Sequence, residues 1–305
     1  MIKSLGLLEQ ALFIRKIEEK IVEIYPTDLI QSPLHLSIGQ ESIATGVCSG
    51  LSNDDQLFTT YRSHAYFLAK GGDLNSFIAE LMGRKTGCCQ GKGGSMHLAD
   101  SKVNFMGTSA IVASTLPHAV GASYANKILG KKNLVACISG DGAADAGVYH
   151  ESLNFASLHQ LPIIFIVEDN DLAVHSTKKE RQSFELQEHA KAYNLLTFSL
   201  NETQDPVVVS KFMENVYSKV NTEKRPAWVS LRAFRYKEHV GVGEDFEMGY
   251  RSKFEFDNWS AKDPLISTKF EKSFLDELDN IIEKAFQFAR NSPFPEPSDL
   301  HADVI

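Results

Sequence analysis

Residues 134–172 read LVACISGDGAADAGVYHESLNFASLHQLPIIFIVEDNDL, and this stretch decides the fold. Residues 134–139 and 162–167 are short apolar runs that predict buried strands, and the pattern of residues 148–159 between them predicts a helix. A strand, a helix and a second strand in such close succession form a βαβ unit, whose two strands are parallel. The stretch therefore predicts an α/β fold built on a parallel sheet.

Each of these strands ends in side chains that carry ligand oxygens. The first runs into Asp141, which stands between Gly140 and Gly142, and the second runs into Asn170. One crossover helix brings the two carboxyl ends together, and ligands of parallel α/β sheets bind beyond that edge. Magnesium prefers oxygen ligands and is commonly shared with a phosphate, while glycines let the backbone approach a diphosphate. The spacing therefore predicts a site for a diphosphate with its metal ion.

The rest of the chain adds helices and one long loop to this unit. Helical patterns or helix-favouring compositions cover residues 5–24, 73–82, 111–129, 206–220 and 274–289, and residues 227–234 predict a further strand. Residues 83–107 contain six glycines and no apolar period, so we expect a long ordered loop there. No Gly/Ser linker divides the chain, which favours a single domain over residues 1–305 with helical arms.

Composition excludes several classes of protein. The 31 basic and 39 acidic residues give a net charge of −8 without a basic run, which argues against a nucleic-acid partner. The first 20 residues meet charge before any apolar run reaches the length of a signal peptide or membrane span, so we expect a cytoplasmic protein with no membrane contact. The four cysteines show no zinc-ligand spacing and are interpreted as free thiols.

The sequence resembles the alpha subunits of thiamine-diphosphate-dependent 2-oxoacid dehydrogenases, the pyruvate, branched-chain and acetoin dehydrogenase E1 alpha family. Gly-Asp-Gly followed by a distant asparagine is the thiamine-diphosphate motif of that family. The likeness extends over nearly the whole chain through landmarks that occur in family order: HLSIGQES (35–42), TYRSH (60–64), GRKTGCCQGKGGSMHL (83–98), RYKEH (235–239) and SPFPEPSDL (292–300). It implies the thiamine-diphosphate-binding fold, with helices on both faces of the sheet.

The resemblance also implies roles for individual residues. The magnesium ligands would be Asp141, Asn170 and the carbonyl of Leu172. The remaining cofactor-binding residues would be Gly142 and Ala143 against the diphosphate, Tyr61 and Arg62 as a diphosphate-contacting pair, and Ile111 and Val112 beside the two rings. His35 and His239 match the active-site histidines of the family, with His239 also reaching the phosphates, and His64 is a third catalytic candidate that could point into the channel. His97 is expected to organise its loop.

The implied enzyme is incomplete in this chain. In the family, the glutamate that activates the aminopyrimidine belongs to a beta subunit, so the resemblance implies an alpha2-beta2 assembly. The implied reaction is decarboxylation of a 2-oxoacid with acyl transfer to a lipoyl group, which a lipoyl acyltransferase would carry. The alternative is a transketolase-like or carboligating subunit of a specialised biosynthetic pathway, and it rests on three departures from the family: Leu172, Lys237 and Glu238.

The loop that carries His239 has few apolar side chains. Residues 235–245 read RYKEHVGVGED, with two glycines and several charges. We expect this loop to be mobile alone and to become ordered when cofactor and metal bind.

Overall fold

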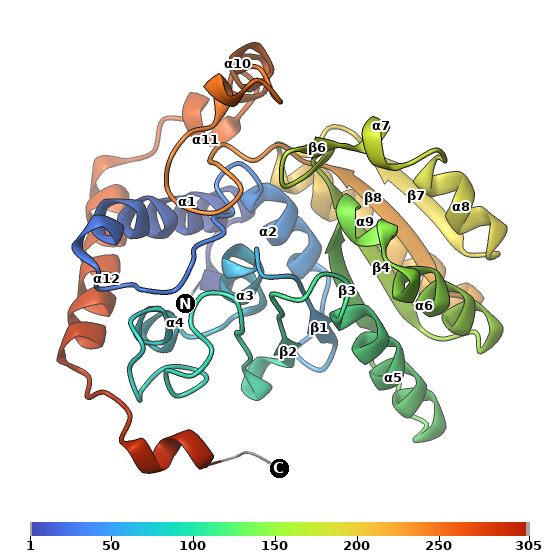
Figure 1. The fold of residues 1–305 in the computed structure, drawn as a ribbon, viewed down its shortest axis with the longest axis horizontal. Helices are drawn as coiled ribbons and strands as arrows, with labels where there is room; N and C mark the ends of the chain where they lie inside the picture. Colours follow the sequence, from blue (N-terminus) through green and yellow to red (C-terminus); the bar gives the residue numbers. More distant parts are fainter. Residues whose placement is uncertain (1, 303–305) are drawn as a thin grey trace.

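A six-stranded parallel sheet forms the centre of the computed structural model, which describes residues 2–302 (Figure 1). All of its neighbouring strands pair in parallel. The order across the sheet is β2 (Phe105–Gly107), β1 (Gln56–Phe58), β3 (Val135–Gly140), β4 (Ile163–Asp169), β8 (Ala227–Arg232) and β7 (Leu196–Leu200). The predicted strands correspond to β3, β4 and β8, which confirms the parallel α/β fold.

Helices cover both faces of the sheet, because alternate side chains of each central strand point to opposite sides. In β3, Val135 and Cys137 pack into one apolar core, while Ala136 and Ile138 pack into another. The first core is covered by α5 (Thr115–Ile128), α6 (Gly147–Leu158) and α8 (Leu186–Ala192). The second is covered by α1 (Leu7–Ile24), α2 (Glu41–Ser49), α3 (His64–Lys70) and α9 (Pro206–Glu223). The expected two-sided layering is confirmed.

Helical arms extend from this layered body. The last helix, α12 (Lys272–Asn291), packs its apolar side against α4 (Leu74–Leu81) and α1, and α10 (Lys253–Ser260) and α11 (Pro264–Ser267) precede it. Figure 1 shows α12 running along one side of the molecule toward the loop that follows α4. Asp73 caps α4 as predicted, since its carboxylate accepts the backbone N–H of Ser76 at 2.8 Å.

The sequence did not predict the three outer strands. β1 and β2 have three residues each and β7 has five, so their patterns are too short to separate from loop. Residues 83–107 form a loop as expected, except that η3 (Ser101–Val103) and β2 occupy its end. Within residues 2–302, no helix combines the length and the hydropathy needed to cross a membrane.

Candidate active site

The ends of β3 and β4 bring the predicted metal ligands together. Gly140 pairs with Glu168 in the sheet, so Asp141 and Asn170 leave adjacent strands at the same edge. Asp141 opens the short turn η4 (Asp141–Asp145), and Leu172 opens the small hairpin strand β5 (Leu172–Ala173). The sheet register thus produces the arrangement that the βαβ spacing predicts.

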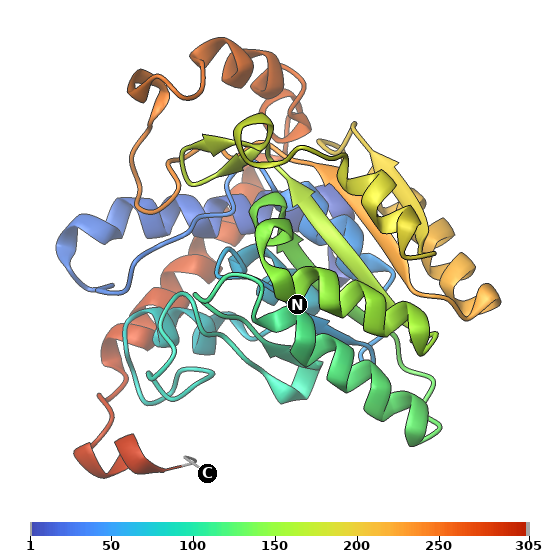
Figure 2. The same ribbon diagram turned by 45° about the vertical axis from the view of Figure 1, so that its right-hand side comes forward.

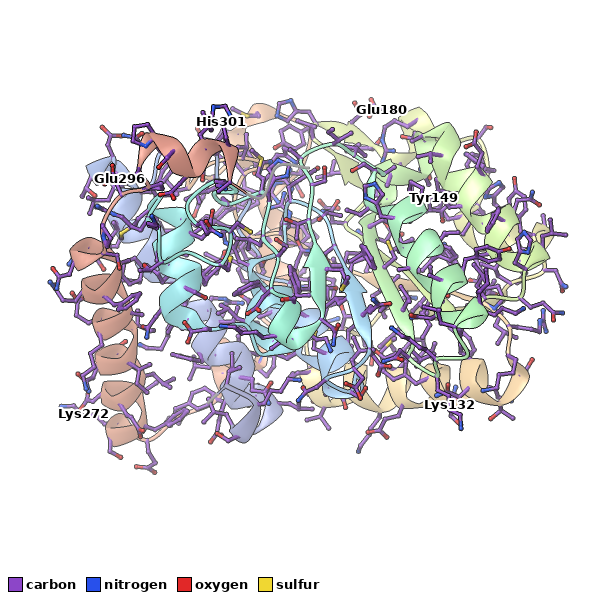
Figure 3. The ribbon with its side chains drawn as sticks, turned by 90° about the horizontal axis from the view of Figure 1, so that it is seen from below. Lys132, Tyr149, Glu180, Lys272, Glu296 and His301 are labelled. Atoms are coloured by element: carbon purple, nitrogen blue, oxygen red, sulfur yellow. The ribbon has the colours of Figure 1, made fainter. Side chains whose placement is uncertain are left out.

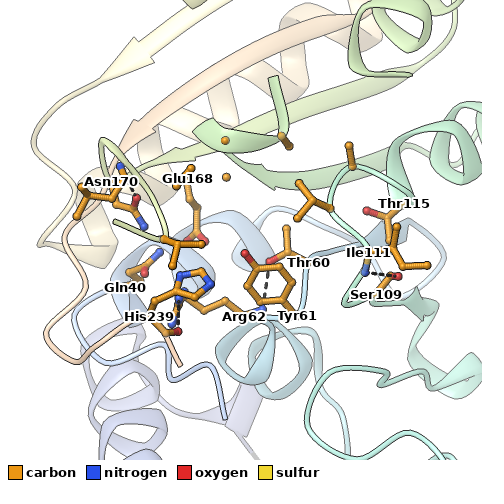
Figure 4. A pocket seen from close by; sticks show the side chains of 18 residues that line it. Gln40, Thr60, Tyr61, Arg62, Ser109, Ile111, Thr115, Glu168, Asn170 and His239 are labelled. Atoms are coloured by element: carbon orange, nitrogen blue, oxygen red, sulfur yellow. Dashed lines mark hydrogen bonds between the residues drawn. The ribbon is translucent and has the colours of Figure 1, made fainter. Parts of the chain in front are cut away.

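A cavity of about 180 Å³ lies beyond this edge. It is lined by nine of the predicted residues, namely Tyr61, Arg62, Ile111, Val112, Gly142, Ala143, Asn170, Leu172 and His239. Figure 4 shows Tyr61, Arg62 and His239 side by side, with Asn170 near Glu168 and Ile111 at the far end of the cavity. Residues from six separate stretches of sequence therefore converge on one space.

Asp141 lies under the cavity with one oxygen in a salt bridge and the other without a partner. Its side chain is 1% exposed, its Oδ2 accepts Nη2 of Arg181 at 2.5 Å, and its buried Oδ1 has no hydrogen-bond partner. Burial, followed by the nearby charge of Asp169, raises the pKa of Asp141 to about 6 although Arg181 opposes this. A buried carboxylate oxygen without a partner is unfavourable unless a cation satisfies it. This donor set fits a hard metal ion.

Three side chains that follow the hairpin of β5 and β6 (Ser176–Thr177) hold the acidic groups around Asp141. Arg181 bridges Asp141 and Asp145, and Gln182 donates its amide to the carbonyl of Asp141 at 3.0 Å. Lys178 forms a salt bridge with Asp169. The sequence analysis missed this cluster, because nothing local to residues 178–182 relates them to Gly-Asp-Gly.

Arg62 joins the two segments that carry the candidate histidines. Its Nη1 donates to the carbonyl of Leu36 at 2.7 Å and its Nη2 donates to the carbonyl of His239 at 3.0 Å. Burial lowers the pKa of Arg62 to about 10, so the guanidinium is still charged at neutral pH. A guanidinium has five N–H donors, which leaves donors for an anion in the cavity that Arg62 lines.

His35, Tyr61 and His239 form a compact aromatic group, in which Tyr61 and His239 line the cavity while His35 packs against both without lining it. The ring of Tyr61 lies 4.3 Å from that of His35 and 5.8 Å from that of His239, centroid to centroid, and the two imidazoles lie 5.2 Å apart. Burial, followed by the charge of Arg62, lowers the pKa of each histidine to about 3. Both imidazoles are therefore neutral at pH 7 and able to accept a proton or a hydrogen bond.

The structure does not bring His64 into the cavity. His64 is fully buried at the start of α3, where its Nδ1 lies 2.6 Å from Oε1 of Glu18 and its Nε2 lies 2.8 Å from Oγ of Ser95. Both ring nitrogens thus have partners. The expected catalytic placement of His64 is therefore wrong. His64 instead links α1 to the loop of residues 83–107, which we call the glycine-rich loop, because this side of α3 faces the core and not the strand ends.

The loop of residues 235–245 is held by buried ionic contacts. Asp245 forms salt bridges with Arg235 and Arg251, and all three side chains are 1% or 2% exposed. Gly241 also donates its N–H to the carbonyl of Leu34 at 2.9 Å. These contacts hold the loop through a three-residue ionic cluster whose third member, Arg251, lies outside the segment. Its mobility without cofactor stays a prediction.

Two further polar residues line the cavity and were not singled out as candidates. Glu168 and Gln40 each have one buried oxygen without a hydrogen-bond partner. Burial raises the pKa of Glu168 to about 7. Its position at the end of an apolar strand was the available signal, whereas Gln40 precedes a helix that the sequence did not predict.

Fold and site together define an α/β protein with a metal-fitting carboxylate and an arginine-lined cavity at the carboxyl edge of its sheet. The family model of the dehydrogenase E1 component matches residues 9–298, and the chain belongs to that family.

Curated relatives match over nearly the full chain. The alpha subunit of acetoin:2,6-dichlorophenolindophenol oxidoreductase from Bacillus subtilis is 31% identical, over 99% of this chain and 93% of its own length. The pyruvate dehydrogenase E1 component subunit alpha of Porphyra purpurea is 32% identical, over 98% of this chain and 91% of its own. The predicted resemblance is thus confirmed at the level of the family.

A solved structure supports the fold. Transketolase from Campylobacter jejuni aligns with 94% of this chain at a TM-score of 0.60 and 16% identity. The aligned part is 48% of the transketolase chain, so this chain corresponds to about half of that enzyme.

Proposed function

We propose that this chain is the alpha subunit of a thiamine-diphosphate- and magnesium-dependent enzyme that decarboxylates a 2-oxoacid and passes the acyl group to a lipoyl acceptor. The observation that carries the proposal is the buried, unpartnered Oδ1 of Asp141 beside a cavity lined by Asn170, Arg62 and His239. The family and the names of the curated relatives support it.

The strand ends would hold the metal and the diphosphate. Asp141, Asn170 and the carbonyl of Leu172 offer oxygens to Mg²⁺. A Cβ added to Gly140 would meet nothing within 4 Å, so the backbone there is open to close approach by a phosphate. Arg62 would contribute charge-assisted hydrogen bonds to the phosphate oxygens. The bound cofactor supplies the carbanion chemistry of the reaction.

The cavity wall would control protons and water. The neutral imidazole of His239 can accept a proton from a group in the cavity, and the adjacent ring of His35 fixes one side of it. Ile111 and Val112 give the opposite wall an apolar surface that keeps water from the reacting centre.

The partner we propose is a beta subunit that covers the mouth of the cavity. A cavity of about 180 Å³ is smaller than the roughly 300–1,000 Å³ of complete small-molecule sites, which supports a second surface that completes it. Six exposed apolar side chains lie in and around α5 and α6, which we call the α5–α6 patch: Ile111, Val112, Ile128, Leu129, Phe155 and Leu158. Figure 2 shows the two helices side by side. Ile111 and Val112, just before α5, also line the cavity, whereas the other four lie toward the C-terminal ends of α5 and α6.

The alternative, a carboligating subunit, loses part of its support. Neither Lys237 nor Glu238 lines the cavity: the carbonyl of Lys237 accepts hydrogen bonds from Arg235 and Arg251, and the carboxylate of Glu238 accepts the N–H of Gly243. Only Leu172 of the three departures faces the cavity.

Co-expression with a beta subunit tests the proposed function. We expect the isolated chain to show no turnover, and the complex to decarboxylate a 2-oxoacid when a panel is assayed with an artificial electron acceptor. Leu158→Glu should weaken assembly, because it places a charge in the α5–α6 patch, whereas Phe254→Glu on α10 should not. Turnover by the isolated chain, or equal assembly of both variants, would contradict the proposal.

Arg181→Met tests the positioning of Asp141. Removing the guanidinium leaves Oδ2 of Asp141 unpaired near Asp145, so we expect Mn²⁺ to bind about 10- to 100-fold more weakly, the effect typical of residues that orient a metal ligand. Electron paramagnetic resonance of Mn²⁺ with thiamine diphosphate measures this. Lys191→Met, which removes an exposed ion pair on α8, is the control. Unchanged or tighter Mn²⁺ binding in Arg181→Met would show that Arg181 does not position the ligand.

A further inference from the structure

Two adjacent cysteines lie against the residue that organises the glycine-rich loop. Cys88 and Cys89 are half-buried, and their sulfur atoms lie within 4.8 Å of each other and of a carboxylate oxygen of Glu80. Cys48 and Cys137, in contrast, are fully buried in the two cores. Of the four thiols in the chain, only the adjacent pair combines proximity with access.

Glu80 holds the loop through four backbone hydrogen bonds. Its Oε2 accepts the N–H groups of Cys89 at 2.8 Å and Gly91 at 2.9 Å, and its Oε1 accepts those of Gly93 at 2.7 Å and Gly94 at 3.1 Å. The side chain of Glu80 is fully buried, so these four N–H groups take the place of water as hydrogen-bond donors to its carboxylate. Four donors use the lone pairs of both oxygens, which leaves Glu80 unavailable to a cation, and the two thiols remain as the reactive groups.

The two thiols differ in acidity. A hydrogen bond from the Cys88 thiol lowers the pKa of Cys89, while that same interaction, followed by burial, raises the pKa of Cys88. Cys88 also packs against the larger apolar core, whereas Cys89 is not part of either core, so we assign Cys89 as the attacking thiol and Cys88 as its neighbour. A low-pKa, accessible cysteine beside a resolving cysteine is the arrangement found in redox-sensitive sites.

We propose that Cys88 and Cys89 form a dithiol modification site, which a low-molecular-weight disulfide oxidises to a disulfide between the two adjacent residues. The Cys89 thiolate attacks one sulfur of the oxidant, forms a mixed disulfide and releases one thiolate. Cys88 then loses its proton and attacks the Cys89 sulfur, which releases the second thiolate. The two cysteines lose two electrons and two protons, and the oxidant becomes two thiols.

A disulfide between Cys88 and Cys89 closes a small covalent ring, and its formation must disturb the Glu80 hydrogen bonds. Adjacent Cα atoms are about 3.8 Å apart across a trans peptide, whereas those of an ordinary disulfide are about 4.4–6.8 Å apart. The backbone at residues 88–89 must therefore rotate, and the N–H of Cys89 leaves Glu80. Such a strained disulfide is also easily reduced, so the change is reversible.

The loop connects the cysteines to the active-site wall and to the end of the chain. Ser95 binds His64, which binds Glu18, and Glu18 accepts the N–H of Ser37 at 2.8 Å, next to the carbonyl of Leu36 that anchors Arg62. On its outer side, Lys85 pairs with Asp299 at 2.7 Å. Figure 3 shows the segment between Glu296 and His301 lying across this loop. The loop therefore contacts both the segment that anchors Arg62 and the C-terminal segment.

The test uses the full chain, oxidised with glutathione disulfide and digested under native conditions. We expect the peptide that contains Cys88 and Cys89 to lose two hydrogens, and trypsin to cleave after Lys92 about 10-fold faster, with dithiothreitol reversing both changes. Cys89→Ser should abolish both changes, and Cys48→Ser should leave both intact. This readout requires no cofactor and does not depend on the proposed function.

Three results would overturn the site: no reaction with glutathione disulfide, a stable mixed disulfide at Cys89 without ring closure, or ring closure with unchanged cleavage after Lys92. A Cys88→Ser chain should stop at the mixed disulfide, which separates the nucleophilic from the resolving thiol. Ring closure in the Cys89→Ser chain through another cysteine would equally contradict the assignment.

Discussion

Asp141→Ala should abolish the magnesium-dependent binding of thiamine diphosphate while the fold stays intact. The substitution removes the only charged ligand among the three proposed metal ligands, at a strand end where the backbone already leaves the sheet. Residues that merely orient a ligand change metal affinity by about 10- to 100-fold. We therefore expect loss of the ligand itself to weaken binding by more than about 100-fold. Calorimetric titration of the cofactor with and without Mg²⁺ measures the change.

The surroundings of Asp141 supply a matched control. Arg181 also pairs with Asp145, so the guanidinium keeps a partner in the Asp141→Ala chain and the hairpin stays anchored. Asp145→Asn removes the same kind of contact to Arg181 but no proposed ligand, and it should bind the cofactor nearly normally. Asn170→Ala should weaken binding less than Asp141→Ala does, because an uncharged ligand is lost. Unchanged cofactor affinity in Asp141→Ala would contradict the assignment of Asp141 as a magnesium ligand.

The parts of the site that the sequence predicted lie next to regular elements with clear patterns. β3 and β4 are buried on both faces and are therefore continuously apolar, which makes their ends easy to locate. Once the ends of two adjacent parallel strands are known, the proximity of Asp141 and Asn170 follows from the register. Tyr61, Arg62 and His239 came from the family resemblance, because no local pattern relates two loops that are far apart in the chain.

The parts that the sequence missed depend on contacts between distant segments. Arg181 reaches Asp141 across a hairpin whose strands have two residues each, too few for any pattern. Arg251 reaches Asp245 from outside the loop segment, so the sequence of residues 235–245 alone did not indicate this anchor. His64 stands two positions after Arg62, but it is the first residue of α3 and its ring binds Glu18 and Ser95, so sequence proximity to Arg62 did not place it in the cavity.

His239→Ala should lower turnover of the alpha–beta complex by about two or more orders of magnitude, the scale expected for a positioned proton-transfer group. The backbone at this position is anchored independently of the side chain, since Arg62 binds the carbonyl of His239 and the Asp245 cluster holds the loop. The substitution therefore removes the imidazole without releasing the segment. Cofactor affinity should change much less than turnover, because Asp141, Asn170 and Arg62 remain.

The comparison with His175→Ala separates a role in the reaction from a general effect of losing a ring. His175 is exposed and contacts Tyr250 at 4.7 Å between ring centroids, on the same side of the molecule but outside the cavity. The charge of His175 acts on His239, but His175 does not line the cavity, so we expect His175→Ala to keep turnover within about 2-fold. Because the imidazole of His239 is neutral, it must accept a proton before it can donate one. A proton-transfer group acts in the transition state, so the loss of activity in His239→Ala should appear in kcat more than in KM. The contradicting result is full activity of His239→Ala with the beta subunit present while Asp141→Ala is inactive. It would support the metal site but show that His239 has no role in the reaction.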